Sequence, residues 1–431
     1  MDTRHGRLAW ICLIFHTNEF SVLEANVMKV LFLSELFYPH GGGAELATYL
    51  YAKLLSERGL NVVVVTNRFP GESEISKRKN LTVHRLSLFK RTTSVKYSIL
   101  FKIDVLFSSF LKKLIKWADV VYVPRFWYSA IPLAKFYRKS VVVHLHDYLP
   151  VCPLSHAPYS AANKPCIKRG FCSLGCIYTW EKTIGRGFFG TLSSLTLNPI
   201  SHVFMNKLIK LSDAIVCVSK SHKAILTKAD ESFKYRVHTI YNPLPHVSPI
   251  DVKGADFGYL GGSNYLKGFL VLFKALERIN RDGCKSINVH ATKFSHFSGC
   301  NSLFVRGFKV HANLQSSQFE ELLKKVRCII VPSIFPETFS YATVEALLRR
   351  QLVIASDVGA IPEVASGCEG AFLFPPGDYE QLAKKILYVK DLDNETVISL
   401  GKRNRETTLS KFSNEKVITK FMNLLNLVLE K

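Results

Sequence analysis

Short runs of valine and isoleucine recur along the chain and alternate with segments of helical periodicity. Such runs are typical of strands buried on both faces, as in parallel sheets covered by crossover helices. The first series of predicted strands occupies residues 29–34, 61–66, 119–123, 141–145, 214–218 and 236–241. The second series occupies residues 257–261, 287–291, 303–307, 328–332, 352–356 and 371–374. The pattern predicts an α/β protein with doubly wound sheets.

The two series of strands predict two domains. Residues 241–256, between the series, contain three prolines and a glycine, which is typical of an interdomain linker. A chain of 431 residues also exceeds what one hydrophobic core usually supports. In such sheets ligands bind at the carboxyl ends of the strands, so a cleft between the domains is the expected site. Helices are predicted over residues 44–58, after Gly268, from about Thr338 and from Tyr379.

The N-terminal residues 1–27 are expected to lie outside the fold. Residues 8–15 form a short apolar run behind a basic opening, but residues 16–26 make a poor signal-cleavage region. Met28 starts MKVLFLSELFYP, which reads as a natural start followed at once by a strand. We therefore interpret residues 1–27 as an upstream extension. No stretch of 18 apolar residues occurs, so no transmembrane helix is expected.

The net charge of +23 favours an anionic partner, such as nucleotide phosphates, an anionic membrane surface or nucleic acid. Residues 77–116 are rich in lysine and arginine, contain only one acid, Asp104, and interleave these charges with apolar residues. A basic amphipathic helix of this kind can lie on a membrane, although packing on the domain with solvated lysines explains it equally well. Nucleic acid is not expected, because stacking-aromatic motifs and zinc-finger spacings are missing from the sequence.

Two glycine-containing turns could approach an anion. The motif GGGAE, residues 41–45, follows a predicted strand at a helix start, where backbone N–H groups and the helix dipole attract a phosphate. In GYLGGSNYLKG, residues 258–268, Lys267 lies at another helix start and could pair with a diphosphate. Purely steric glycines and a solvated lysine remain the alternative interpretation of each motif.

Two glutamates mark the stretch PSIFPETFSYATVEALLRRQLVIASDVGAIPE, residues 332–363. A carboxylate is a good bidentate acceptor for the vicinal hydroxyls of a sugar, and the N–H groups of Thr338 to Ser340 are expected to point at an anion. Glu337 could instead be an acid favoured by the first helical turn. That alternative does not explain Glu345, which lies among apolar residues on a helix expected to be buried, because a buried acid needs a partner.

Taken in order, these motifs resemble glycosyltransferase family four, whose members are retaining enzymes of the GT-B fold. The matching segments are MKVLFLSELFYPHGGGAE, VVVHLHDY, VCVSKS, YNP, YLGG…LKG, VPS…PETFSYATVEA, GAIPE and PPGD. The resemblance covers nearly the whole chain from Met28. It implies two Rossmann-like domains facing each other across a cleft. We expect an acceptor-side domain over residues 28–245, a nucleotide-sugar domain over 246–412, and a C-terminal helix over 413–431 that packs back toward the first domain.

The resemblance implies a role for each matching residue. His146 would lie near the transferred sugar, Lys267 would bind the diphosphate and Glu337 would bind donor sugar hydroxyls; these are the three expected catalytic residues. Lys267 and Glu337 also belong to the expected donor site. Four other members of the donor site would present backbone groups to phosphate and sugar: Gly42, Gly43, Phe339 and Ser340. The last member, Glu345, would hold the ribose hydroxyls.

The resemblance also implies a mechanism without a required metal or cofactor. Lys267 and backbone donors would stabilise the charge on the departing nucleoside diphosphate, and same-face attack would retain the anomeric configuration. Two positions depart from the family pattern. Gly262 stands where arginine is common, which leaves a non-catalytic nucleotide-sugar or carbohydrate-binding protein as the alternative function. Ser340 stands where glycine is common, and we expect little consequence because serine is small.

Four cysteines cluster in an insert over residues 150–178, directly after His146. They are candidate ligands of a structural zinc ion, since a cytosolic enzyme is not expected to hold disulfides. Their spacing is not a clean pair of CxxC motifs, so free cysteines or two disulfides remain alternatives. The four residues are Cys152, Cys166, Cys172 and Cys176.

The sequence as a whole predicts a retaining glycosyltransferase. The donor would be a UDP- or GDP-sugar, and the acceptor a lipid-linked sugar, a glycan or a polysaccharide. The basic charge predicts a cytoplasmic protein bound peripherally to the inner face of the cell membrane, with an anionic membrane surface as a partner.

Overall fold

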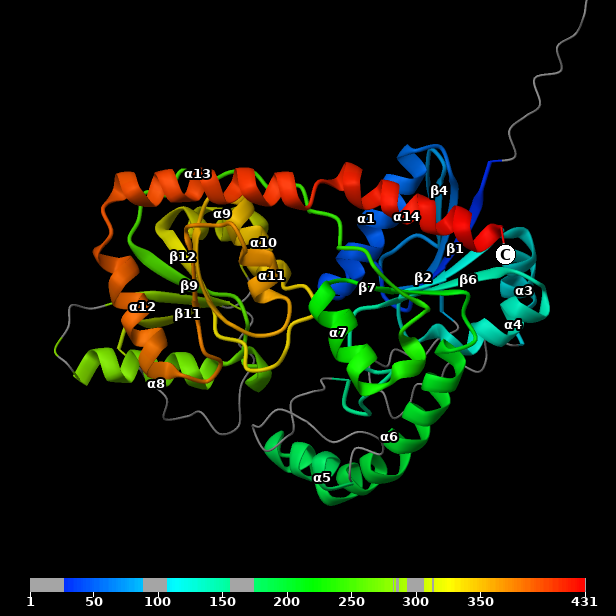
Figure 1. Ribbon diagram of the computed structural model, residues 1–431, viewed down its shortest axis with the longest axis horizontal. Helices are drawn as coiled ribbons and strands as arrows, with labels where there is room; N and C mark the ends of the chain where they lie inside the picture. The colour runs from blue at the N-terminus through cyan, green and yellow to red at the C-terminus, as the bar shows by residue number, and fades with distance from the viewer. Residues whose placement is uncertain are drawn as a thin grey trace, which may run out of the picture.

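The structure is a computed structural model with two sheets of mainly parallel strands (Figure 1). It describes residues 27–87, 107–155, 174–281, 283, 287–292, 306–311 and 314–430. The proposed N-terminal extension, except Val27, therefore lies outside the described residues. Within the described part of the chain, no helix is long and apolar enough to cross a membrane.

The N-terminal sheet has the strand order β3-β4-β2-β1-β5-β6-β7-β8, and all its neighbours pair in parallel except β3 and β4. Its strands are β1 (Lys29–Leu33), β2 (Asn61–Asn67), β3 (Ile75–Arg78), β4 (Leu81–Leu86), β5 (Val120–Val123), β6 (Ser140–Leu145), β7 (Ala214–Cys217) and β8 (Val237–Thr239). Six of them confirm the predicted strands. β3, at the sheet edge, and its neighbour β4 were not predicted, because they alternate polar and apolar residues.

The C-terminal sheet is parallel throughout and has the order β11-β10-β9-β12-β13-β14. Its strands are β9 (Asp256–Tyr259), β10 (Val289–Thr292), β11 (Phe308–His311), β12 (Val326–Val331), β13 (Leu352–Ser356) and β14 (Ala371–Phe374). One predicted strand is placed wrongly. Residues 306–307 form a turn and β11 begins only at Phe308, while residues 303–305 lie outside the described part.

Helices cover both faces of each sheet. On the N-terminal sheet, α1 and α14 share one apolar core, and α3, α4, α7 and the end of α6 contribute to the core on the opposite face. On the C-terminal sheet, α8 and α12 cover one face and α9, α10 and α11 the other. Their bounds are α1 (Gly43–Glu57), α3 (Ser109–Trp117), α4 (Ala130–Phe136), α5 (Leu174–Thr183), α6 (Phe188–Ile209), α7 (Lys220–Ala229), α8 (Phe269–Arg281), α9 (Ser316–Lys325), α10 (Tyr341–Leu348), α11 (Ile361–Ala365), α12 (Tyr379–Asp391), α13 (Asn394–Lys411) and α14 (Asn414–Leu429).

The last helix returns to the first domain. α13 runs along the C-terminal domain, and α14 continues across to the N-terminal sheet (Figure 1). Phe421 of α14 is fully buried and packs its ring 4.7 Å from that of Tyr51. The hydroxyl of Ser140 donates a hydrogen bond to the carbonyl of Val428 at 2.7 Å. α14 therefore belongs to the core of the N-terminal domain, although its sequence follows the whole C-terminal domain.

The basic segment 77–116 is only partly described. Its last part forms α3, where Leu111 and Ile115 are fully buried against the N-terminal domain. Packing on the domain therefore explains the apolar stripe of α3. Residues 88–106, which hold much of the remaining basic charge, lie outside the described residues.

Candidate active site

Lys267 and Glu337 meet as an ion pair at the carboxyl end of the C-terminal sheet. Lys267 ends the short helix η5 (Tyr265–Lys267) after β9, and Glu337 lies in the loop between β12 and α10. The Nζ of Lys267 donates to Oε1 of Glu337 at 2.6 Å, and Ser333 Oγ donates to the same oxygen, also at 2.6 Å. Glu337 is buried, whereas about a third of the Lys267 side chain is exposed. Two residues predicted from separate motifs thus form one charged group.

The backbone of Glu337 is fixed by the GAIPE segment. The N–H of Ala360 donates to the carbonyl of Glu337 at 2.8 Å. Gly359 has φ +60, and a Cβ there would lie 2.5 Å from both the nitrogen and the carbonyl oxygen of Glu337. The close approach and the left-handed backbone both require glycine. The glycine therefore sets the position of the predicted sugar-binding acid.

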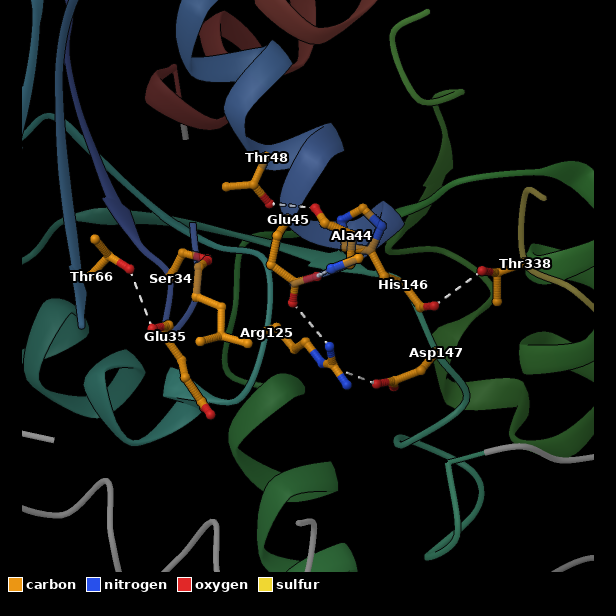
Figure 2. A network of polar contacts seen from close by, with 12 residues as sticks. Ser34, Glu35, Ala44, Glu45, Thr48, Thr66, Arg125, His146, Asp147 and Thr338 are labelled. Atoms are coloured by element: carbon orange, nitrogen blue, oxygen red, sulfur yellow. Dashed lines mark hydrogen bonds and ion pairs between the residues drawn. The ribbon is translucent and has the colours of Figure 1, made fainter. Parts of the chain in front are cut away.

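His146 comes to this pair from the other domain. It follows β6, and its carbonyl accepts a hydrogen bond from Thr338 Oγ1 at 3.0 Å, as Figure 2 shows. Its ring stacks on that of His144, with 4.6 Å between centroids. Burial lowers the pKa of His146 to about 3, and the charges of His222 and Arg125 act in the same direction. The imidazole is therefore neutral at physiological pH.

A guanidinium between two acids lies beside His146 (Figure 2). Arg125 Nη1 donates to Glu45 Oε1 at 3.0 Å, and its Nε lies 3.9 Å from Asp147 Oδ2. Burial acts to lower the pKa of Arg125, but the carboxylates of Glu45 and Asp147 outweigh burial and raise it. Burial also raises the pKa of the Asp147 carboxyl, which Arg125 partly offsets. The group therefore sets two buried carboxylates against one guanidinium at this end of the N-terminal sheet.

The sequence prediction missed this group. Arg125 lies two residues after the strand at 119–123, and Asp147 lies two residues after the strand at 141–145, so both lie where the carboxyl ends of parallel strands meet. β5 and β6 are paired neighbours, with Val123 opposite Val143. A charged residue two positions after the end of each of two adjacent strands is the signal that could have identified the cluster.

The glycine turn before α1 differs from its prediction in one respect. The N–H of Gly42 was expected to meet a phosphate, but it donates to Glu45 Oε2 at 2.7 Å. Gly43 lies against the other domain, since a Cβ there would come within 2.9 Å of the Tyr341 ring. The turn therefore brings the start of α1 up to the start of α10. Its contact with a phosphate stays a prediction.

Helix α10 begins three residues later than predicted, at Tyr341. Ser340 precedes it with φ 64 and ψ 74, and its Oγ contacts Thr343 Oγ1 at 2.9 Å instead of capping a backbone N–H. The expectation that serine matters little here overlooked the backbone, because φ 64 lies in the left-handed region that favours glycine. Phe339 is buried in the domain core, 5.8 Å from the ring of Phe412, so only its backbone can face a ligand.

Glu345 has the partner that a buried acid needs, and it is less buried than expected. Its Oε2 accepts a hydrogen bond from Arg349 Nη1 at 3.1 Å, one turn further along α10. The same guanidinium donates through Nη2 to Glu320 at 3.2 Å, and the Glu345 side chain is 28% exposed. The ion pair with Arg349 therefore accounts for this acid structurally, while its exposed fraction leaves an oxygen available to a ligand.

The backbone conformation at position 262 also explains why a glycine stands there. Its φ is +63, and its carbonyl accepts a hydrogen bond from the Tyr259 hydroxyl at 3.0 Å. An arginine at this position would have to adopt the left-handed conformation, which is costly for a residue with a Cβ. The backbone of the turn after β9 therefore favours glycine at position 262. Glycine supplies no positive charge there, in contrast to the arginine of the family pattern.

The cysteine cluster is only half described. Cys152 is buried in the N-terminal core, and Cys176 is partly exposed on α5. Cys166 and Cys172 lie outside the described residues. Within the described ranges no group of three or more His, Cys, Asp or Glu residues could hold a metal ion. The zinc site stays a prediction.

Comparison with known proteins gives the family. A family model described as Glycosyltransferase Family 4 matches residues 41–246, and one described as Glycosyl transferases group 1 matches residues 254–391. The first covers the N-terminal domain with its glycine turn and His146, and the second covers the Lys267–Glu337 pair. The chain belongs to glycosyltransferase family four. It is therefore a glycosyltransferase, and its two facing α/β domains have the GT-B fold.

Solved structures agree with this glycosyltransferase in fold at low sequence identity. Sucrose-phosphate synthase from Thermosynechococcus elongatus is 15% identical with a TM-score of 0.66, and the match covers 93% of this chain and 99% of that one. HepE from Anabaena, in complex with UDP and glucose, is 17% identical with a TM-score of 0.61 over 93% and 99%. A glycosyltransferase from Rickettsia africae is 16% identical with a TM-score of 0.63 over 94% and 100%. No curated protein matches the chain.

Proposed function

We propose that this glycosyltransferase moves a hexose from a UDP- or GDP-sugar to a lipid-linked, glycan or polysaccharide acceptor, with retention of configuration, at the cytoplasmic face of the membrane. The observation that carries the proposal is the Lys267–Glu337 pair, held 2.6 Å apart beside the Thr338–His146 bridge between the domains. This arrangement places a cation and a carboxylate next to the point where the loop of His146, a neutral histidine, meets the other domain.

The donor would lie between the carboxyl end of the C-terminal sheet and the start of α10. Lys267 is partly exposed and can exchange Glu337 for the diphosphate, which frees the Glu337 carboxylate to accept hydrogen bonds from sugar hydroxyls. α10 begins without a side-chain cap, so its first N–H groups can meet a phosphate. Glu345 would accept the ribose hydroxyls through its exposed edge.

Catalysis would depend on positive groups that already lie where negative charge develops in the transition state. Negative charge develops on the leaving diphosphate, and Lys267 with the positive end of α10 would stabilise it, so the proposal requires no metal ion. His146 is neutral, and its Nε2 is buried without a hydrogen-bond partner among the described residues. That nitrogen could bind a hydroxyl of the transferred sugar. The acceptor hydroxyl would attack from the face that the diphosphate leaves.

The acceptor would approach from the N-terminal domain, where the cluster of Glu45, Arg125 and Asp147 lies beside His146. The acceptor class and the membrane face rest on the net charge of +23 and on the family. The HepE structure contains UDP and glucose, which is consistent with a hexose donor for a protein of this fold.

The test is a thermal-shift panel of UDP- and GDP-hexoses, followed by an assay of nucleotide release. We expect one donor to stabilise the protein, and Glu337→Gln to abolish the shift. Glu321→Gln is the matched control, because Glu321 lies on exposed α9 and pairs only with Lys324 among the described residues. No shift from any donor would reject the proposal. A shift without release of nucleoside diphosphate to any glycan or lipid acceptor would favour the non-catalytic binder.

A further inference from the structure

Helices α5 and α6 form a hairpin that projects from the N-terminal domain at the lower edge of Figure 1. Only the end of α6 joins the domain core, through Met205, Leu208 and Ile209. The first half of α6 packs on α5 and stands away from both sheets. This part of the molecule is used by neither the donor site nor the cluster around Arg125.

The stretch of α6 from Phe188 to Phe204 has its polarity reversed. The side chains that it buries are small or polar, namely Thr191, Ser194, Asn198 and Ser201. The side chains that it exposes are large and apolar: Phe188 at 75%, Leu192 at 49%, Ile200 at 62% and Phe204 at 42%. These four follow a spacing of four or eight residues, so they form one ridge along the helix.

A helix on a water-soluble domain normally turns its apolar stripe inward. The reversed pattern on α6 indicates that the exposed ridge meets an apolar phase, as in helices that lie in a membrane interface. The tip of the hairpin strengthens this indication. Phe189, next to Phe188, is 83% exposed, and two adjacent exposed phenylalanines at a turn can insert between lipid headgroups.

The charge of the hairpin selects an anionic surface. α6 carries one charged residue, Lys207, and the preceding turn and helix end carry Arg186 and Lys182. The single acid in residues 174–211, Glu181, is buried and lies 2.9 Å from Arg186. Cations beside exposed aromatic and aliphatic side chains fit an anionic bilayer better than a second copy of this chain, whose net charge is +23.

We propose that the α5–α6 hairpin docks this glycosyltransferase on an anionic lipid bilayer through the ridge of Phe188, Leu192, Ile200 and Phe204. The purpose of the docking rests on the proposed function, because it serves a lipid-linked acceptor. Asn206 Nδ2 of α6 donates to the carbonyl of Pro150 at 2.6 Å. Pro150 lies four residues after His146, so the hairpin is fastened to the loop that carries the active-site histidine.

The experiment is cosedimentation of the full chain with vesicles of phosphatidylcholine alone and with phosphatidylglycerol added. We expect binding only to the anionic vesicles and weakening at high salt. F188S/F189S should weaken binding at least about tenfold, since each phenylalanine contributes apolar area to the bilayer. L192S/I200S tests the ridge without changing the tip. Phe136→Ser is the matched control, because Phe136 is 76% exposed on α4 and does not belong to the ridge or to the tip of the hairpin.

The proposal is overturned if the wild type does not bind anionic vesicles, if both double variants bind as the wild type does, or if F136S weakens binding equally. It is also overturned if the hairpin variants only convert an oligomer to a monomer in light scattering. Melting curves check that each variant folds. Donor thermal shifts on the same proteins separate the two proposals. A missing donor shift with intact vesicle binding rejects the proposed function alone, and the reverse result rejects only the docking surface.

Discussion

The carboxylate of Glu363, in the C-terminal domain, accepts the backbone N–H of Lys220 at the start of α7 in the N-terminal domain, with 3.1 Å between Oε1 and the nitrogen. Its other oxygen accepts the N–H of Ser221 at 3.2 Å, and the Tyr241 hydroxyl donates to Oε1. A carboxylate at a helix N-terminus is favoured by the dipole and satisfies N–H groups that lack helical partners. The GAIPE glutamate therefore joins the two domains.

Glu363→Ala should loosen this junction. We expect a loss of about 1–2 kcal/mol in the free energy of unfolding, the usual size for a lost charged helix cap. Donor affinity should fall with it, because the cleft would no longer be held in one geometry. Urea unfolding and donor titration measure the two effects. Tyr241→Phe is the partial control, since it removes one donor to Glu363 and leaves both α7 contacts. An E363A protein with unchanged donor affinity would contradict the role in closure.

Lys267→Met should lower kcat/KM by about 100- to 1,000-fold, the range found when one preorganised donor to a developing oxyanion is removed. The reason is that Lys267 pairs with Glu337, in the loop that leads into α10, at 2.6 Å. Steady-state kinetics with the donor identified by thermal shift gives the ratio. Lys274→Met, on α8 near the ring of Tyr379, should leave kcat/KM unchanged. If kcat/KM falls only because KM rises, with kcat unchanged, Lys267 binds the donor equally in the ground state and in the transition state.

Two glycine substitutions separate backbone strain from contact with the site. Gly359→Ala and Gly377→Ala both place a Cβ at positive φ, +60 and +84 respectively. At Gly377 nothing lies within 4 Å, so the cost should be strain alone, about 1 kcal/mol. At Gly359 the Cβ meets the Glu337 backbone, and the cost should exceed that of G377A by at least about 1–3 kcal/mol. Urea unfolding measures both. Equal costs would show that the loop moves aside and that Gly359 does not position Glu337.

Stability should fall as the pH is lowered from about 6.5 toward 4. Burial lowers the pKa of His222 to about 4 and that of His146 to about 3, so the unfolded chain binds protons that the folded chain does not. Each such histidine contributes a slope of up to about 1.4 kcal/mol per pH unit in this window. Asp147, whose pKa is raised by burial, acts in the opposite direction.

Urea unfolding at pH 8, 6 and 5 tests this prediction. His222 donates through Nε2 to the carbonyl of Asp147 at 3.0 Å, and the amide of an asparagine can supply a similar donor without titrating. H222N should therefore flatten the pH dependence while the protein stays folded at pH 8. A slope unchanged in H222N would assign the acid sensitivity to other groups.

The buried strands could be predicted because a strand that is buried on both faces needs apolar residues at every position. This requirement appears in the sequence as a run of valine and isoleucine. The edge strand β3 and its neighbour β4 could not be predicted, since strands with one polar side resemble loops in composition. The glycines and glutamates of the motifs could be predicted as candidate site residues because the motifs occur in the order typical of the family. The ion pair of Glu345 with Arg349 could also have been read from the sequence, because residues four apart on a helix are neighbours.

The remaining site relationships depend on three-dimensional placement. Arg125 and Asp147 are 22 positions apart, and only the pairing of β5 with β6 brings them together. The left-handed backbone of Ser340 is equally invisible in the sequence, because serine rarely adopts it. Sequence reasoning compared side-chain sizes at this position, whereas the backbone angle is the property that favours glycine there.

Because α14 packs on the N-terminal sheet, it determines the order in which the two domains can complete their folding during synthesis. Domains generally fold as they leave the ribosome, the first one first. Here the first domain emerges with a vacant apolar groove, because Phe421 and its neighbours on α14 are made only after the entire second domain. The N-terminal domain therefore stays partly open until the second domain and α14 have been translated, so it is completed after the domain that follows it.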